Sequence, residues 1–212
     1  MSISAILGGT FNPPHHGHIT PALEVATHLG IKKLGLMPCK IAPHKPVQVE
    51  QKHRVNMVKV LCETDQRLYP ELIELELPSP SYTVKTLKAL KQRDKHTICF
   101  FIGADSLYTL HKWYVWETLL DYCHIVVMRR DDQQYSPPDH ILPWLEAHTT
   151  TDVNTLHTAE NGYVYLANSG LVTVSSTELR TKIQHEDDDN MQQWLSQPVL
   201  DYIRHHKLYK KK

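Results

Sequence analysis

The chain has 212 residues, enough for one medium-sized domain. Its 41% hydrophobic residues can form a buried core, and its 23 Lys and Arg residues balance its 23 Asp and Glu residues. This balance speaks against a protein that chiefly coats nucleic acid or an anionic membrane surface, although a local basic cluster can still bind a small phosphorylated ligand.

The predicted elements alternate short apolar runs with stretches that have apolar residues at helical spacing. In chain order they are a strand at 3–7, a helix at 17–29, a strand at 34–37, a helix at 51–62, a strand at 72–77, a helix at 81–93, a strand at 97–102, an aromatic-rich helical segment around 113–116, a strand at 125–128, a short helix at 141–148 within the polar, turn-rich segment 131–162, a strand at 163–167, and helices at 176–184 and 199–206.

The repeated strand–helix–strand order predicts an α/β fold, a Rossmann-like, doubly wound parallel sheet with helices on both faces and right-handed crossovers. The run 97–102 is apolar throughout, as expected of a strand that helices cover on both sides. We expect a single domain spanning 1–212, with a small helical C-terminal part at about 174–212.

The cysteines and the apolar runs both indicate a soluble cytoplasmic protein. The four cysteines are far apart and form no CxxC pair, which is typical of reduced thiols and not of a disulfide framework or a zinc ribbon. The start, MSISAILGGT, lacks the basic segment and the long apolar run of a signal peptide. No run approaches the roughly 18 apolar residues of a membrane span.

The stretch GGTFNPPHHGH, residues 8–18, leads from the first predicted strand into the first helix. Ligands of open parallel sheets bind beyond the carboxyl ends of the strands, where glycines allow close approach and a helix N-terminus attracts anions. His15 and His18 are three residues apart, so both can face one phosphate. A metal site is the alternative, but no Cys or acidic residue lies around them at a metal-like spacing. The other histidines, including His53 and His206, show no such grouping and are expected at the surface or at helix ends.

Five blocks resemble, in sequence and in order, the nucleotidyltransferases with an (H/T)xGH signature, and within them the bacterial nicotinate-mononucleotide adenylyltransferases. The blocks are GGTFNPPHHGH (8–18), APHK (42–45), PSYT (80–83), FIGADSLYTLHKWYVWETLL (101–120) and VSSTELR (174–180). The resemblance covers nearly the whole chain and implies a single nucleotidyltransferase domain.

The reaction that the resemblance implies is adenylyl transfer from ATP to nicotinate mononucleotide, with Mg²⁺, giving deamido-NAD and pyrophosphate in NAD biosynthesis. The mononucleotide phosphate would attack the α-phosphorus of ATP in line, without a covalent enzyme intermediate. Catalysis would then depend on positioning the substrates and on stabilising charge at the reacting phosphate. We expect no nucleic-acid or membrane partner.

The resemblance also implies roles for individual residues. The catalytic residues would be His15, His18, Lys45 and Arg180, with the histidines on the α-phosphate and the two cations on phosphate charge. ATP would be bound by Gly8, Gly9, Thr10, Phe11, Asn12, Gly17, Gly103, Asp105, Ser175, Ser176 and Thr177. Nicotinate mononucleotide would be bound by His44, Lys45, Tyr82, Thr83, Trp113 and Tyr114. In this second group Trp113 would stack on the pyridine ring, while main-chain N–H groups of Thr83 and Tyr114 bond the ring carboxylate. No side chain is assigned as a metal ligand.

Several of these residues also have plain structural interpretations. Lys45 by itself would be a surface lysine, Trp113 a core aromatic residue, and Asp105 the N-cap of the following helix. Ser175 is a good N-cap, with Glu178 at the position that completes a capping box. At least one aromatic residue of the WYVW segment, which begins at Trp113, should be partly exposed.

Asn12 departs from the family pattern, which has aspartate at this position. Asparagine keeps an acceptor oxygen but loses the negative charge. One rival interpretation is a pantetheine-phosphate adenylyltransferase, which typically has threonine in place of His15 and lacks the PSYT and Trp113 blocks. Another is a non-catalytic nucleotide-binding regulator, for which Asn12 is the only hint. Retention of both histidines and both cations argues against that regulator.

Overall fold

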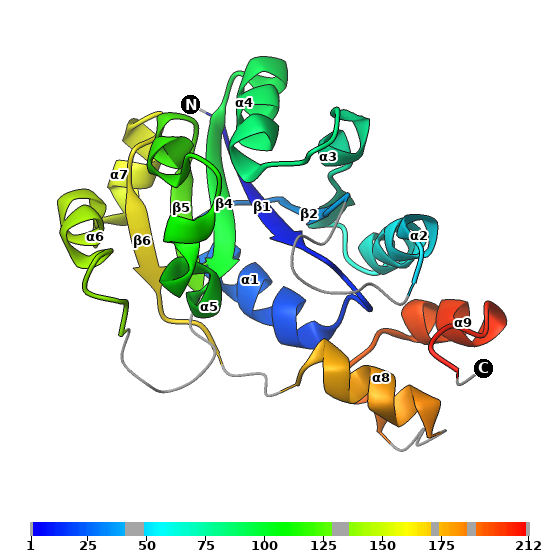
Figure 1. The fold of residues 1–212 in the computed structure, drawn as a ribbon. Helices are drawn as coiled ribbons and strands as arrows, with labels where there is room; N and C mark the ends of the chain where they lie inside the picture. The colour runs from blue at the N-terminus through cyan, green and yellow to red at the C-terminus, as the bar shows by residue number, and fades with distance from the viewer. Residues whose placement is uncertain (1, 41–48, 129–135, 171–173, 186–189, 211–212) are drawn as a thin grey trace.

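The computed structural model describes the chain except for residues 1, 41–48, 129–135, 171–173, 186–189 and 211–212. The described residues form a six-stranded sheet in the order β3-β2-β1-β4-β5-β6, in which every neighbouring pair is parallel (Figure 1). The strands are β1 (Ile3–Gly9), β2 (Leu34–Pro38), β3 (Leu68–Pro70), β4 (Thr97–Gly103), β5 (His124–Met128) and β6 (Val164–Ala167). The predicted doubly wound parallel sheet is confirmed.

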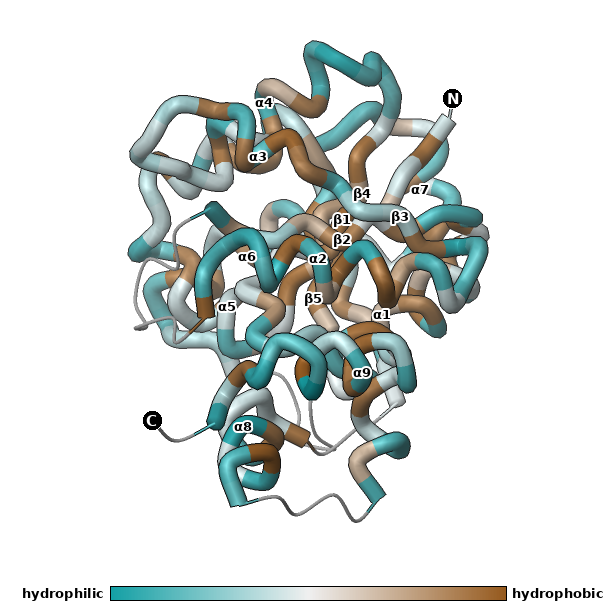
Figure 2. Tube along the Cα trace, turned by 90° about the vertical axis from the view of Figure 1, so that its right-hand side faces the viewer, coloured by the Kyte–Doolittle hydropathy of each residue, from teal (hydrophilic) through white to brown (hydrophobic). Residues whose placement is uncertain are grey.

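Helices cover both faces of this sheet. One face packs against α1 (His16–His28), α2 (Gln51–Cys62), α7 (Val153–Thr158), α8 (Ser176–Gln184), the 3₁₀ helix η3 (Met191–Gln193) and α9 (Gln197–His205). The other packs against α3 (Ile73–Glu76), α4 (Thr83–Asp94), α5 (Ala104–Tyr108), the 3₁₀ helices η1 (Leu110–Lys112) and η2 (Trp116–Asp121), and α6 (Leu142–His148). Figure 2 shows the hydrophobic strands lying between these helices.

The two cores explain why the strands are continuously apolar. Successive side chains of a strand point to opposite faces, so Ala5 and Leu7 of β1 join one core while Ile6 joins the other. Within the described part of the chain, no helix is both long and apolar enough to cross a membrane.

Successive strands are added on one side of β1 up to β3, and on the other side of β1 from β4 onwards. From β1 the chain passes through α1 and α2 to β2 and β3, whereas from β4 it passes through α5 to β5 on the opposite side of the sheet. The covering helices change face at the same point, so the crossovers keep one hand. Open parallel sheets bind ligands beyond the strand ends at such a switch point. Here those ends are Gly9 and Gly103.

Local structure departs from the sequence prediction at three places. Residues 72–77, predicted as a strand, contain the short helix α3, and the third strand lies upstream at β3. Their alternating pattern is misleading because Glu74 is buried, where its carboxylate accepts a hydrogen bond of 2.9 Å from the main-chain N–H of Lys40. The third strand, β3, has only three residues and pairs with β2 alone. Three residues are too few to show an alternation of apolar and polar side chains.

The other two departures concern short helical segments. The aromatic segment is not one helix, because Trp113 is extended and Val115 has a φ of 43°, between η1 and η2. Tyr114 is 53% exposed, as expected for at least one of these aromatic residues. The polar segment 131–162 contains α7 in addition to the predicted helix. Of the six residues of α7 only Leu156 is fully buried, so the sequence of this helix shows no helical spacing of apolar residues.

Candidate functional site

Distant parts of the chain fix the loop that follows β1. Arg54 of α2 donates through Nη1 to the Thr10 carbonyl at 2.8 Å, and Arg180 of α8 donates through Nη1 to the Asn12 carbonyl at 2.8 Å. The Tyr209 hydroxyl donates to Oδ1 of Asn12, also at 2.8 Å. The shape of this loop is therefore set by tertiary contacts and not by local sequence alone.

The two histidines of the loop lie together, as their spacing predicts. His15 is the N-cap of α1 and is only 1% exposed, and its ring centroid lies 4.0 Å from that of His18. Nε2 of His15 lies 3.0 Å from Oγ of Ser176 at the start of α8. The N-termini of α1 and α8 therefore meet at His15. Such ends present main-chain N–H groups that suit an anion.

The start of α8 has the predicted capping box. The Ser175 hydroxyl accepts from the Glu178 N–H at 3.1 Å, and the Glu178 carboxylate accepts from the Ser175 N–H at 2.8 Å. Hydrogen bonds from the hydroxyl and then from the N–H of Ser175 lower the pKa of Glu178. Arg180 lies one turn further on, where Nη2 donates to Oγ1 of Thr177 at 3.0 Å. Its guanidinium thus bonds both its own helix and the loop after β1.

The glycines of the loop are required by the protein's own packing. A Cβ atom on Gly8 would lie 3.1 Å from the Phe100 ring, and one on Gly17 would lie 2.6 Å from Cγ1 of Val174. Phe11 is buried in the core with a φ of 50°. Room for a ligand is therefore not the sole reason for these glycines.

The PSYT block and the aromatic block meet at the start of α4. Tyr82 is the N-cap of α4 and Thr83 is its first residue, so the N–H of Thr83 is among those that have no partner within a helix. The Tyr82 ring stacks on that of Tyr114, with centroids 4.3 Å apart and 22° between the planes. Trp113 is half-buried and packs against the core on this face. Residues about 30 positions apart are thereby brought together, as the sequence predicts.

The end of β4 supplies the third part of the candidate site. Gly103 is the N-cap of α5, and Asp105 is exposed in the first turn of that helix. The alternative in which Asp105 caps the helix is therefore wrong. A carboxylate in the first turn is still favoured by the helix dipole. The predicted residues His44 and Lys45 lie outside the described residues.

Arg54 is the site-forming residue that the sequence analysis missed most clearly. It is 2% exposed, and its guanidinium donates to the carbonyls of Thr10 and Cys39 at 2.8 Å and of Lys40 at 3.4 Å. It forms no ion pair with any described carboxylate. The signal was present, because Arg54 lies four residues before Val58, on the apolar face of α2. Tyr209 was also missed, and no local pattern marks it.

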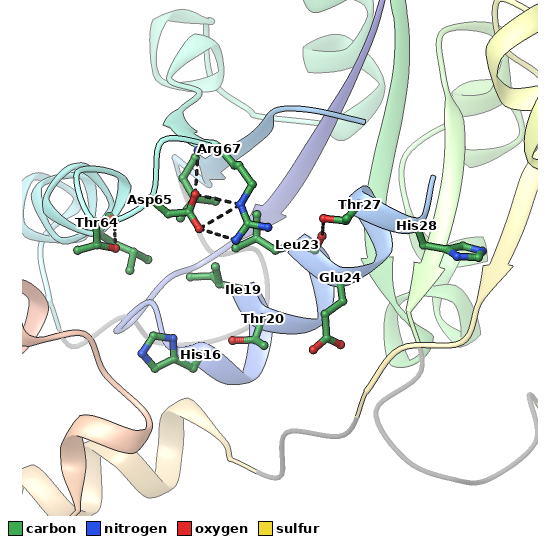
Figure 3. A pocket seen from close by; sticks show the side chains of 12 residues that line it. His16, Ile19, Thr20, Leu23, Glu24, Thr27, His28, Thr64, Asp65 and Arg67 are labelled. Carbon is green, nitrogen blue, oxygen red and sulfur yellow. Dashed lines mark hydrogen bonds and ion pairs between the residues drawn. The ribbon is translucent and has the colours of Figure 1, made fainter. Parts of the chain in front are cut away.

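A groove of about 810 Å³ lies along another side of α1, towards the end of α2 and the start of β3 (Figure 3). Its lining residues are His16, Ile19, Thr20, Leu23, Glu24, Thr27, His28, Leu61, Thr64, Asp65, Arg67 and Leu68. Asp65 and Arg67 bond each other at 2.6 Å, and burial lowers the pKa of His16. None of the substrate-binding residues predicted from the sequence lines this groove.

Comparisons with known proteins identify the family of this chain. The chain matches the cytidylyltransferase-like family model over residues 6–182. It is 38% identical over 210 residues to a protein of Idiomarina loihiensis named "Probable nicotinate-nucleotide adenylyltransferase", covering 98% of this chain and 99% of the relative. It is 37% identical over 207 residues to a protein of the same name from Pseudoalteromonas atlantica, covering 96% and 93%. The chain belongs to the nicotinate-nucleotide adenylyltransferase family.

Solved structures share the fold of this chain. The Plasmodium falciparum nicotinic acid mononucleotide adenylyltransferase complexed with NaAD has a TM-score of 0.74 at 19% identity, covering 99% of this chain and 98% of that one. The same enzyme complexed with APC has a TM-score of 0.71 with the same coverage. At this identity the likeness concerns the fold, and it confirms the Rossmann-like architecture.

Proposed function

We propose that this chain transfers the adenylyl group of ATP to nicotinate mononucleotide, forming deamido-NAD and releasing pyrophosphate. The observation that carries the proposal is the meeting of His15, His18 and the start of α8 beyond the end of β1. The full-length identity of 38% to a relative of that name supports the choice of substrate class.

Adenylyl transfer requires no nucleophile from the protein. A phosphate oxygen of nicotinate mononucleotide forms a bond to the α-phosphorus of ATP while the bond to the departing pyrophosphate breaks. His15 and His18 would donate hydrogen bonds to the α-phosphate, and Arg180, with Lys45, would offset charge on the phosphates. Preorganised donors of this kind stabilise the charge that develops in the transition state.

The nicotinate ring would bind where the start of α4 meets the aromatic block. There the main-chain N–H groups of Thr83 and Tyr114 would donate to the ring carboxylate, and Trp113 would offer a stacking surface. Both donors belong to the backbone, so the site would bind the ring carboxylate without a basic side chain.

Mg²⁺ would enter this reaction as part of the MgATP substrate. No group of three or more described His, Cys, Asp or Glu side chains is placed to hold a metal ion. The histidines of the loop are nitrogen donors, whereas Mg²⁺ prefers oxygen and is commonly carried on substrate phosphates. A cytoplasmic location remains a prediction, supported by four cysteines that are all free.

The proposal is tested by following pyrophosphate release with ATP and one second substrate at a time. We expect release with nicotinate mononucleotide, together with formation of deamido-NAD, and little release with phosphopantetheine or with ATP alone. Release with phosphopantetheine would favour the rival adenylyltransferase. ATP binding without release in any mixture would favour the non-catalytic regulator.

A further inference from the structure

The last described segment of the chain reaches back to the loop after β1. Tyr209 is 6% exposed, and its hydroxyl donates to Oδ1 of Asn12, which stands 197 positions earlier in the sequence. Figure 1 shows α8 and α9 lying beyond the end of β1, beside the C-terminus. The contact therefore links the last described segment directly to the loop after β1, which carries His15 and His18.

Asn12 is held at two of its polar groups at once. Arg180 fixes its main-chain carbonyl and Tyr209 fixes its side-chain oxygen, each at 2.8 Å. His15 follows three residues later, so the orientation of Asn12 helps to set where the histidine rings point. A tyrosine hydroxyl is protonated at neutral pH even at its ordinary pKa, and burial raises the pKa of Tyr209 further, so its hydroxyl can act as the donor.

The attachment of α9 to the body of the protein uses different contacts. The Tyr202 hydroxyl accepts from Nδ2 of Asn56 at 3.0 Å and lies 3.0 Å from Nδ1 of His53, both on α2. Among the described residues, the hydrogen bonds of the Tyr202 hydroxyl go to α2 and none goes to the loop. The two tyrosines thus allow the anchoring of α9 to be separated from the positioning of Asn12.

We propose that Tyr209 is a positioning residue for adenylyl transfer, whose hydroxyl holds Asn12 and thereby the loop that carries His15 and His18. The kinetic consequences of this inference rest on the proposed function. The hydrogen bond between Tyr209 and Asn12, here called the tether, does not depend on that function. In this proposal Asn12 serves as a hydrogen-bond acceptor, and an aspartate at this position would also supply the acceptor oxygen.

Tyr209→Phe removes the hydroxyl alone, and Tyr202→Phe is its matched control. An unmade buried hydrogen bond corresponds to roughly a fivefold to hundredfold change in an equilibrium or rate. We expect kcat to fall by about tenfold or more in Tyr209→Phe, with little change in the KM for ATP, because the misplacement affects the transition state most. In Tyr202→Phe, kcat should stay within about twofold of the wild type. An unchanged kcat in Tyr209→Phe, or an equal fall in both variants, overturns the proposal.

A double-mutant cycle ties the effect to Asn12. In an Asn12→Ala background, Tyr209→Phe should cause no further loss of kcat, since the acceptor is already absent. In an Asn12→Asp background, Tyr209→Phe should still lower kcat. Falls that multiply independently in the Asn12→Ala background contradict the tether.

Amide hydrogen exchange gives a readout that needs no activity. In the free protein, the amides of residues 15–18 should exchange faster in Tyr209→Phe than in the wild type, and Tyr202→Phe should match the wild type there. Unchanged exchange in Tyr209→Phe overturns the tether. If the wild type shows no adenylyl transfer at all, the proposed function fails while the exchange result still decides the tether. Should Tyr209→Phe not fold, Asn12→Ala serves for the same exchange measurement.

Discussion

His15 and His18 differ in how deeply they are buried. His15 is buried beside Ser176, whereas the half-buried His18 lies at the edge of the pair. His18 is thus the more exposed of the two rings. We predict that His18→Ala lowers kcat by about 10²-fold or more, with little change in the KM for ATP, because the lost donor acts mainly in the transition state.

The neighbouring residue provides the control for this substitution. His16 lines the groove along α1, and its main-chain N–H, which an alanine would keep, donates to the Trp194 carbonyl at 2.8 Å. Steady-state kinetics of His16→Ala should therefore show nearly wild-type kcat. A His18→Ala enzyme with wild-type kcat would mean that His18 does not act on the reacting phosphate.

The proposed choice of substrate also depends on individual hydrogen-bonding groups. The proposed donors, the N–H groups of Thr83 and Tyr114, suit a carboxylate, which accepts both bonds with charge assistance. A carboxamide has one acceptor oxygen and leaves one donor unpaired, at a cost of about 1–3 kcal/mol, to which the lost negative charge adds. We predict that nicotinate mononucleotide is preferred over nicotinamide mononucleotide by more than about 10²-fold in kcat/KM.

Two variants separate the backbone donors from the stacking surface. Thr83→Ala should keep the preference for nicotinate mononucleotide, because the donor is the main-chain N–H. Trp113→Ala should weaken the binding of both mononucleotides alike. Kinetics on both mononucleotides measure this. Comparable wild-type kcat/KM values would show that the ring-binding residues are misassigned.

At the scale of elements, the start of α8 carries two contacts to the loop, from Ser176 and Arg180. Its capping box should therefore matter for both stability and ATP binding. Ser175→Ala should lower stability by about 0.5–2 kcal/mol and raise the KM for ATP as the first turn frays. Thr181→Ala, on the same helix but away from its start, should change neither. Denaturant unfolding and kinetics on the two variants measure these effects, and equal KM values would contradict the role of the cap.

The same cap has a defined pH dependence. The pKa of Glu178 is lowered in the folded state from its ordinary value of 4.5. Its contribution to stability is therefore complete above that value and is lost as the pH falls through the lowered pKa.

An element can be predicted from the sequence when burial imposes a clear pattern of apolar residues on it. The strands covered by helices on both faces, such as β4, were predictable to within a residue or two, because two cores impose a continuous apolar run. The short elements α3 and α7 were not, since one turn of helix buries too few residues to set a period. Among the described motif residues, His15 meets Ser176 and Tyr82 meets Tyr114, since these residues follow a strand end or lie at or near the start of a helix.

Contacts made by single side chains across the fold could not be predicted. Arg54 and Tyr209 reach the loop from α2 and from the end of the chain, and local sequence does not encode which carbonyl or amide they will meet. His206 is exposed at the C-cap of α9, as expected of a surface or helix-end histidine, but its proximity to His53 could not be predicted. His53 and His206 lie at the contact of α2 with α9, with ring centroids 5.1 Å apart.

At the scale of the whole molecule, the candidate site draws on both halves of the sheet and on the C-terminal helices. The loop after β1, the turn after β4 and the start of α4 all border the switch point, while α8 and α9 pack on one face only. The correct site thus depends on the complete set of packed elements. That all of them form one domain remains a prediction.

Stability of this assembly should fall in acid, and His124 is the clearest cause. It is fully buried in β5, where Nδ1 accepts from the Tyr163 N–H at 3.2 Å and Nε2 donates to the Ala159 carbonyl at 3.2 Å. A second ring proton would face the Tyr163 N–H and break this arrangement. Burial is the main cause that lowers the pKa of His124 from 6.5, and burial also lowers the pKa values of His16, His111 and His206.

The sign follows from which state takes up the proton. Below pH 6.5 the unfolded chain binds protons at these histidines before the folded protein does, so folding loses free energy as the pH falls. We predict that Tm drops by several degrees between pH 7.5 and pH 5.5, at a few degrees for each kcal/mol lost. His124→Gln should be less stable at pH 7.5 but should show a smaller drop, whereas His28→Gln, at an exposed helix end, should drop as the wild type does. If His124→Gln loses as many degrees as the wild type over this range, protonation of the buried ring is not what weakens the fold in acid.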